Sequence, residues 1–203
     1  MILCQAAKGR SSNTQKERDV KTGDMRDKGK GQEGGGGDFL SDVKELRRRA
    51  REHMDDGAVT ESHQVDREAV IRLLNTALAT ELICVLRYRR HHFMAAGIHA
   101  QAVAEEFMKH ATEEQGHADK IAKRIVQLGG EPDFSPEGLA TRSHSEYVEG
   151  GDLVDMIREN LVAERIAIES YLEMIRFVGE GDPTTRRMLE GVLGNEEEHA
   201  DEL

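Results

Sequence analysis

The sequence predicts an all-α protein whose main domain is a four-helix bundle preceded by a disordered tail. Charged residues make up 33% of the 203 residues and aromatic residues only 4%, with no tryptophan. Such a composition favours helices over a β-sandwich or a β-barrel. Four long stretches carry apolar residues at spacings of three and four, and glycines and prolines separate these stretches.

The first 37 residues differ in composition from the rest of the chain. They are rich in lysine, arginine, glycine, serine and glutamine, end in four glycines, and carry a net charge of +3 from eight basic and five acidic residues. Such a segment buries too little apolar surface to fold alone, so we expect residues 1–37 to be a disordered tail. Residues 38–65 are expected to form a linker with one short helix, which Ser41 caps and Gly57 closes.

The first helical hairpin is predicted within the domain that covers residues 66–203. Its first helix begins at an Asp66 cap and reaches Gly97, and its second helix covers about residues 99–128. A tight turn at Gly97 makes these helices antiparallel neighbours. The apolar stripe of the first helix comprises Val70, Leu73, Leu74, Ala77, Leu78, Leu82, Val85 and Leu86.

The second hairpin follows a long connection over residues 130–150. Its first helix starts after Asp152 and ends near Gly179, and its second runs from about Thr184, just after Pro183. The connection can span ~65 Å when extended, whereas a helix of about 30 residues is only ~45 Å long. The connection can therefore return along the whole bundle, which gives the ferritin-type topology of two hairpins and one crossover.

Two Glu-x-x-His motifs occupy matched positions in the two hairpins. They are Glu114–His117 on the second long helix and Glu196–His199 on the fourth. Residues three apart share one face of a helix, so the Glu and the His of each motif can reach the same metal ion. Both motifs continue as His-Ala-Asp, which makes a chance occurrence of the pair much less common than that of a single motif.

Two further glutamates lie level with these motifs. Glu81 and Glu164 each precede the turn of their hairpin by 16 residues, which is ~24 Å along a helix and matches the distance of the motifs beyond the turn. A tyrosine follows each glutamate by seven residues, Tyr88 in the first hairpin and Tyr171 in the second. The repeated pattern, offset by 82–83 residues, indicates an internal pseudo-twofold symmetry.

This constellation predicts a di-metal site inside the bundle. In this interpretation Glu81 and Glu164 each bind one metal ion, Glu114 and Glu196 bridge the two ions, and each histidine donates one nitrogen. Four carboxylates offset the charge of two Fe²⁺ ions, imidazoles suit iron, and manganese is the alternative metal. For a single residue, a protonated or salt-bridged buried carboxylate is the simpler explanation. The predicted metal and catalytic set is Glu81, Glu114, His117, Glu164, Glu196 and His199, with Tyr88 as a further catalytic candidate or a core aromatic.

Several neighbouring residues have less specific expectations. Cys84 is expected to be a small core residue, and Glu113 to be solvated or to lie just outside the ligands. His110, one turn before Glu114, is only a candidate for facing an interior route for iron. The fourth helix continues only four residues beyond its histidine, so we expect its half of the site to fray. Histidines near the end of the first long helix are expected to be solvated: His91, His92 and His99.

Around these motifs the sequence resembles the bacterioferritin and DNA-protecting mini-ferritin (Dps-like) superfamily over about residues 66–203. The stretch EEFMKHATEEQGHADKIAKRIVQLGGEPD is similar to the second helix and following loop of bacterioferritins. Gln115 stands where bacterioferritins carry their haem-ligating methionine, so haem is not expected. The chain stops at Leu203 without a fifth helix, and this favours a 12-subunit over a 24-subunit cage. The resemblance implies that the family's ferroxidase ligands are Glu81, Glu114, His117, Glu164, Glu196 and His199, and that Tyr88 matches its helix-one tyrosine.

The resemblance implies a cytoplasmic iron-storage protein that oxidises Fe²⁺ with O₂ or H₂O₂ at a di-iron site within each subunit. Two alternatives stay open: a di-metal enzyme such as a rubrerythrin-like peroxidase or manganese catalase, and a Dps-like protein that protects DNA. Because the whole chain carries −11 and the tail +3, residues 38–203 carry −14, so DNA contact is expected only through the tail. We expect no membrane partner, because no apolar run approaches the roughly 20 residues that span a bilayer.

Overall fold

The computed structural model describes residues 42–98 and 100–203. The predicted tail over 1–37, the Ser41 cap and His99 lie outside the described residues. Within those two ranges every regular element is a helix, which confirms the predicted fold class. The predicted domain boundaries after residues 37 and 65 stay predictions.

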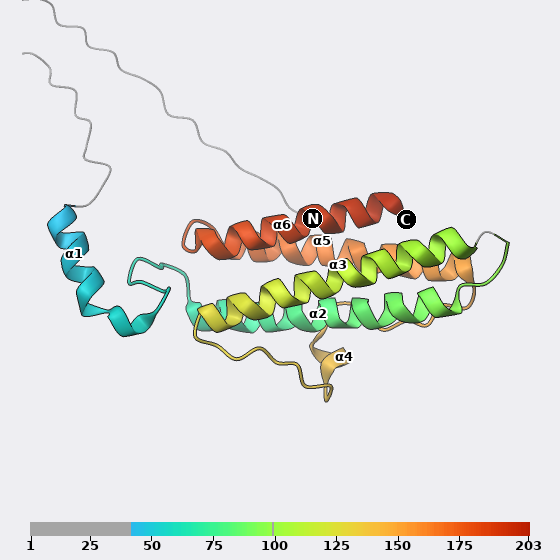
Figure 1. Cartoon of the computed structure of the whole chain (residues 1–203), viewed down its shortest axis with the longest axis horizontal. Helices are drawn as coiled ribbons and strands as arrows, with labels where there is room; N and C mark the ends of the chain where they lie inside the picture. Colours follow the sequence, from blue (N-terminus) through green and yellow to red (C-terminus); the bar gives the residue numbers. More distant parts are fainter. Residues whose placement is uncertain (1–41, 99) are drawn as a thin grey trace, which may run out of the picture. The chain divides into compact units, whose positions relative to one another are not determined.

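Four long helices form the bundle (Figure 1). Helix α2 runs antiparallel to α3, and α5 runs antiparallel to α6. The connection from α3 to α5 returns along the bundle, as its length predicts, and carries one short helix, α4, that the sequence did not reveal. The bounds of these helices are α2 Arg67–Met94, α3 Ala100–Gln127, α4 Leu139–Arg142, α5 Leu153–Val178 and α6 Pro183–Glu202. The expected short helix before the bundle is α1, Val43–Glu52, followed by the 3₁₀ turn Met54–Asp56.

Aspartate caps begin three of the long helices. The side chains of Asp66, Asp152 and Asp182 each accept a hydrogen bond from the backbone N–H three residues later, at 2.9–3.1 Å. Such caps satisfy N–H groups that have no partner within the helix. Helix α6 begins at Pro183, one residue before the predicted start, because proline fits the first helical position.

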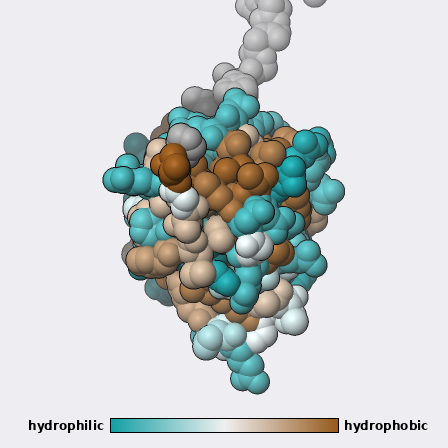
Figure 2. Space-filling view, turned by 90° about the vertical axis from the view of Figure 1, so that its right-hand side faces the viewer, coloured by the Kyte–Doolittle hydropathy of each residue, from teal (hydrophilic) through white to brown (hydrophobic). Residues whose placement is uncertain are grey.

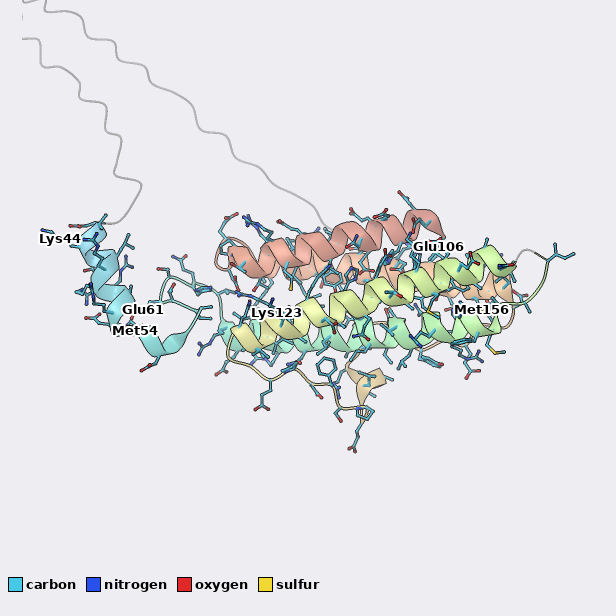
Figure 3. All side chains as sticks on the ribbon, in the orientation of Figure 1. Lys44, Met54, Glu61, Glu106, Lys123 and Met156 are labelled. Carbon is cyan, nitrogen blue, oxygen red and sulfur yellow. The ribbon has the colours of Figure 1, made fainter. Side chains whose placement is uncertain are left out.

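The bundle core consists of two apolar clusters with a polar layer between them. The first cluster includes Leu74, Ile121 and Leu189, and the second includes Tyr88 and Phe107. Along α2, α3 and α5, the residues of the two clusters are separated by a short stretch that carries glutamate or histidine. Figure 3 shows the side chains of the four helices filling the interior of the bundle. This layered order places the predicted metal ligands in the water-excluded middle of the domain.

The far end of α2 holds the returning connection through buried polar contacts. Arg87 donates to the side chain of Asn160 at 3.1 Å and to the carbonyl oxygen of Glu146 at 2.9 Å. His91 is fully buried, with Nε2 3.1 Å from the carbonyl oxygen of Val148. The prediction that His91 is solvated is therefore wrong, because the carbonyls of the connection need donors and the connection covers this face.

Helix α2 is more apolar than inspection of the sequence indicated. An 18-residue window within it has a mean hydropathy of 1.7, and 56% of that window is buried inside the bundle. Leu86, which we expected on the buried stripe, is 49% exposed. A helix that is apolar around most of its circumference is typical of a bundle interior. Its burial identifies α2 as a core helix, although it has the length and composition of a membrane span.

Candidate metal centre

The six predicted ligands converge in the polar layer from all four long helices. Each is at most 1% exposed. Their donor atoms fall into two groups in which all atoms lie within 4.8 Å of one another. We call these groups the His117 half-site (Glu81, Glu114, His117, Glu196) and the His199 half-site (Glu114, Glu164, Glu196, His199). The two half-sites share Glu114 and Glu196, which is the geometry expected of bridging carboxylates.

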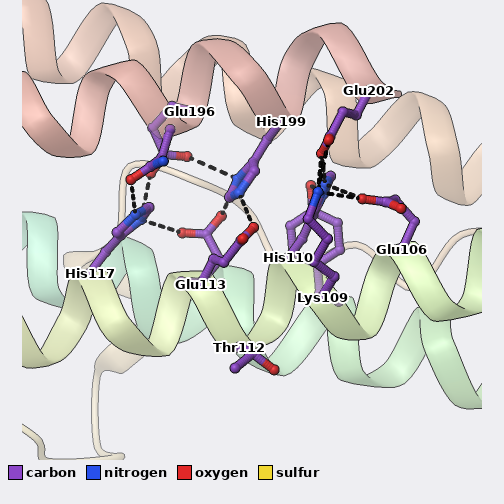
Figure 4. Close-up of polar contacts among 12 residues, drawn as sticks. Glu106, Lys109, His110, Thr112, Glu113, His117, Glu196, His199 and Glu202 are labelled. Carbon is purple, nitrogen blue, oxygen red and sulfur yellow. Dashed lines mark hydrogen bonds and ion pairs between the residues drawn. The ribbon is translucent and has the colours of Figure 1, made fainter.

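Both histidines direct Nδ1 toward the carboxylates (Figure 4). Nδ1 of His117 lies 2.9–3.4 Å from one oxygen of each carboxylate in its half-site. Nδ1 of His199 lies 3.6–3.8 Å from one oxygen of each carboxylate in the other half-site. The two rings stack at 6.1 Å between centroids with an interplanar angle of 27°. Each half-site therefore presents three carboxylates and one imidazole nitrogen to a common centre.

Buried donor atoms without a hydrogen-bond partner concentrate on these residues. A polar atom that is buried without a partner costs about 1–3 kcal/mol, and more if it is charged. A divalent cation in each half-site would accept these lone pairs, so the donor set fits two metal ions of the kind that bind carboxylate and imidazole. The atoms concerned are Glu81 Oε2, Glu114 Oε1, Glu164 Oε2, both carboxylate oxygens of Glu196, and His199 Nδ1.

The electrostatics of the layer separate the four carboxylates into two pairs. Burial, together with the neighbouring carboxylates, raises the pKa of Glu114 and of Glu196 well above the usual range. Burial alone would also raise the pKa of Glu81 and Glu164. The histidines and the other carboxyl groups outweigh burial and lower the pKa of both. Burial opposes protonation of His117, yet the surrounding carboxylates raise its pKa to about 12. Without metal, these shifts favour protons on the shared glutamates and on the histidines.

Two tyrosines cross between the hairpins. The hydroxyl of Tyr88 on α2 donates to Oε1 of Glu164, and the hydroxyl of Tyr171 on α5 donates to Oε1 of Glu81. Burial and the facing carboxylate raise the pKa of both phenols, so both remain donors at neutral pH. Each hairpin therefore contributes a tyrosine that orients a glutamate of the other hairpin, Glu164 or Glu81. The predicted catalytic set contains only Tyr88, but the repeated pattern also makes Tyr171 a candidate hydrogen-bond partner near the metals or a core aromatic.

The outer nitrogens of the two histidines also have partners. Nε2 of His199 lies 2.8 Å from Oε2 of Glu113, and Nε2 of His117 lies 3.2 Å from Oδ1 of Asn195. Hydrogen bonds of this kind fix the tautomer that leaves Nδ1 for a metal. The sequence singled out Glu113 but not Asn195. Their matched places, each directly before a shared glutamate, were the signal that could have identified Asn195.

The end of α6 is anchored rather than frayed. Glu202 accepts hydrogen bonds from Nζ of Lys109 at 2.8 Å and lies 2.9 Å from Nε2 of His110. His110 is fully buried, and its ring stacks on that of His199 at 4.1 Å. Figure 3 places Glu106, which also contacts Lys109 at 2.9 Å, on α3 close to the end of α6. The expectation of fraying is therefore wrong, because contacts with α3 hold the last turn.

Known proteins share this chain's domain and its arrangement of helices. The Ferritin family model, described as a ferritin-like domain, matches residues 71–203. A bacterioferritin of Desulfovibrio desulfuricans is 33% identical over 137 residues, which are 66% of this chain and 72% of that protein. A nutrient stress-induced DNA-binding protein of a Synechococcus species is 34% identical over 131 residues, which are 63% of this chain and 74% of that protein.

Solved structures agree with the sequence relatives. A dodecameric thioferritin, the bacterioferritin-related protein of Bacteroides fragilis, superposes with a TM-score of 0.66 at 29% identity and covers 78% of this chain and 89% of its own. Dps from Thermosynechococcus elongatus has a TM-score of 0.63 at 19% identity, covers 66% and 86% respectively, and supports the fold alone. The four-helix topology, the buried carboxylate–histidine layer and the family match lead to one conclusion: this chain belongs to the ferritin-like family.

Proposed function

We propose that this protein binds two Fe²⁺ ions as substrates in the two half-sites and oxidises them with O₂ or H₂O₂. The observation that carries the proposal is the pair of half-sites that share Glu114 and Glu196 and contain unsatisfied buried donors. With H₂O₂, each Fe²⁺ gives up one electron, and the two electrons with two protons convert the peroxide into two molecules of water. Consuming Fe²⁺ and peroxide together suppresses the formation of hydroxyl radicals.

Each side chain has a distinct part in this proposal. Glu81 and Glu164 each bind one iron ion, and the crossing tyrosines orient them. Glu114 and Glu196 bridge the two positions, and their raised pKa values favour an exchange of protons for metal at both. Two apolar clusters exclude bulk water from both sides of the layer, which strengthens the binding of cations by carboxylates.

We further propose that the protein stores the oxidised iron in a cage of 12 copies in the cytoplasm, with 24 copies as the alternative assembly. The dodecameric relative supports the smaller cage. An exposed apolar surface supports self-association, because large apolar patches on soluble proteins mark interaction sites. Figure 2 shows such side chains gathered at the end of the bundle that carries the α2–α3 turn, where the exposed residues include Phe93, Met94 and Ile98.

Iron oxidation by purified protein tests the assignment of the ligands. Anaerobic loading with Fe²⁺, followed by oxidant, should produce ferric absorbance in the wild-type protein and little in the double variant Glu114→Ala/Glu196→Ala. The matched control is Glu197→Ala/Glu198→Ala, which removes two exposed carboxylates from α6. Equal oxidation rates in the wild type and the first variant would overturn the ligand assignment. Native mass and metal analysis give the assembly and decide between iron and manganese.

A Dps-like role in DNA protection is the second candidate, and the similarity to a nutrient stress-induced DNA-binding protein supports it. The net charge of −14 on residues 38–203 leaves the basic tail as the segment for binding DNA. A gel shift at low salt should disappear when residues 1–37 are deleted. A stable dimer that turns over peroxide without mineralising iron would instead indicate a rubrerythrin-like peroxidase or manganese catalase.

A further inference from the structure

The two half-sites differ in the group that holds their histidine. Glu113 and Asn195 occupy equivalent places, because each directly precedes a shared glutamate and each reaches the histidine of the opposite hairpin. One partner is a carboxylate at 2.8 Å and the other a neutral amide at 3.2 Å. Figure 4 shows Glu113 directed at His199. The pseudo-twofold symmetry of the ligands is therefore broken in the residues that contact them.

This difference changes how strongly each histidine can bind a metal ion. When Nδ1 binds a metal, Nε2 must carry the ring proton, and this N–H group donates a hydrogen bond to its partner. A carboxylate accepts such a hydrogen bond more strongly than an amide, and it increases the electron density on the ring. Glu113 is partly exposed, with 41% of its side chain accessible, so water also solvates its carboxyl group. His199 is consequently the stronger ligand of the two.

The contacts of the two Nδ1 atoms favour the same half-site. Nδ1 of His117 makes a hydrogen bond with Oε2 of Glu114 at 3.3 Å and lies 2.9 Å from Oε1 of Glu196. Nδ1 of His199 has no hydrogen-bond partner. A metal ion that enters the His117 half-site must break a hydrogen bond at Nδ1, whereas one that binds His199 displaces only the longer contacts of 3.6–3.8 Å there. This observation is independent of the outer partners.

We propose that the His199 half-site binds its metal ion first and more tightly, and that Glu113 is the positioning residue responsible for this order. The proposal rests on the proposed function, since it takes the six residues as ligands of two divalent metal ions. It adds an order of filling, which the near-symmetric ligand set does not provide. Asn195 leaves the His117 half-site as the weaker, second position.

Stepwise binding of Co²⁺ without oxygen tests this order. Calorimetry together with the visible absorption of Co²⁺ should resolve two steps in the wild-type protein. Glu113→Gln keeps the shape of the side chain but removes its charge, and should weaken the first step by about 10–100-fold. The reciprocal variant Asn195→Asp should strengthen the second step and bring the two affinities together. Two equal steps in the wild type, or a first step that Glu113→Gln leaves unchanged, would overturn the proposal.

Single histidine variants assign each step to a half-site. His117→Ala should retain the tight step, and His199→Ala should lose it; the opposite result contradicts the proposed order. Thermal unfolding of each metal-free variant establishes that it folds. If an alanine variant does not fold, the conservative variants Glu113→Gln and Asn195→Asp still test the order of binding. If Co²⁺ binding survives in Glu114→Ala/Glu196→Ala, the proposed function itself fails. If binding is lost there but the wild-type steps are equal, only the order fails.

Discussion

Loading the metal-free protein with two divalent ions should release more than one proton per subunit at pH 7, and at most about four. Burial and the neighbouring carboxylates raise the pKa of Glu114 and of Glu196 well above the usual range, which favours the protonated form of both without metal. His117, with a pKa of about 12, holds a further proton, and the raised pKa of His199 favours a proton there as well. Metal ions displace these protons, because carboxylates bind metal in the ionised form and imidazoles in the neutral form.

Ordinary pKa values would give a very different result. With carboxyl groups near pKa 4 and histidines near 6.5, the same site would release only about half a proton at pH 7. Calorimetry of Zn²⁺ binding in two buffers with different ionisation enthalpies measures the number directly. Glu198→Gln, which changes an exposed carboxylate on α6, serves as the control and should leave the number unchanged. A release of one proton or fewer would refute the account of how the metal-free layer balances its charge.

The same reasoning gives the sign of the pH dependence. The groups concerned bind protons in competition with metal, so acidification weakens metal binding and a rise in pH strengthens it. Each proton released contributes about a tenfold change in the affinity for the metal pair per pH unit. A Zn²⁺ affinity that is flat between pH 6 and pH 8 would contradict the expected exchange.

Three further predictions concern stability. Asp182→Asn should lower the free energy of unfolding by about 3 kcal/mol, because it leaves the buried Arg124 without its carboxylate. Folding lowers the pKa of Asp182, so the wild-type protein has this stability above about pH 4 and loses it on further acidification. Urea unfolding at pH 7 and pH 3 should show that the difference in unfolding free energy between the wild type and Asp182→Asn is smaller at pH 3. Tyr171→Phe should cost about 1–3 kcal/mol in metal-free protein through the lost hydrogen bond to Glu81, and an unchanged urea midpoint would contradict this. Gly194→Ala should raise stability by about 0.5–1 kcal/mol, since a Cβ there meets no atom within 4 Å, and a lower melting temperature would speak against it.

The helices and the convergence of the six predicted ligands could be predicted from the sequence. The spacing of residues along a helix determines which face each residue lies on and how far along the axis it lies. Matching Glu81 to Glu114 across a turn needs only the rise per residue. Contacts between the hairpins could not be predicted in the same way, because they depend on how the two pairs of helices pack against each other. The bond from Tyr171 to Glu81 and the contact of Asn195 with a histidine are of this kind. His91 was misjudged because a connection without periodicity covers it.

The polar layer also has a consequence for the specificity of the fold. Apolar clusters tolerate rearranged packing as long as their volume is conserved, so either cluster alone would permit one hairpin to slide by a helical turn of about 5.4 Å against the other. Such a slip would set the Glu81 carboxylate against apolar side chains and separate it from Tyr171. The layer therefore determines the longitudinal register of the hairpins. With an entirely apolar interior, several alignments of the two hairpins would have similar energy.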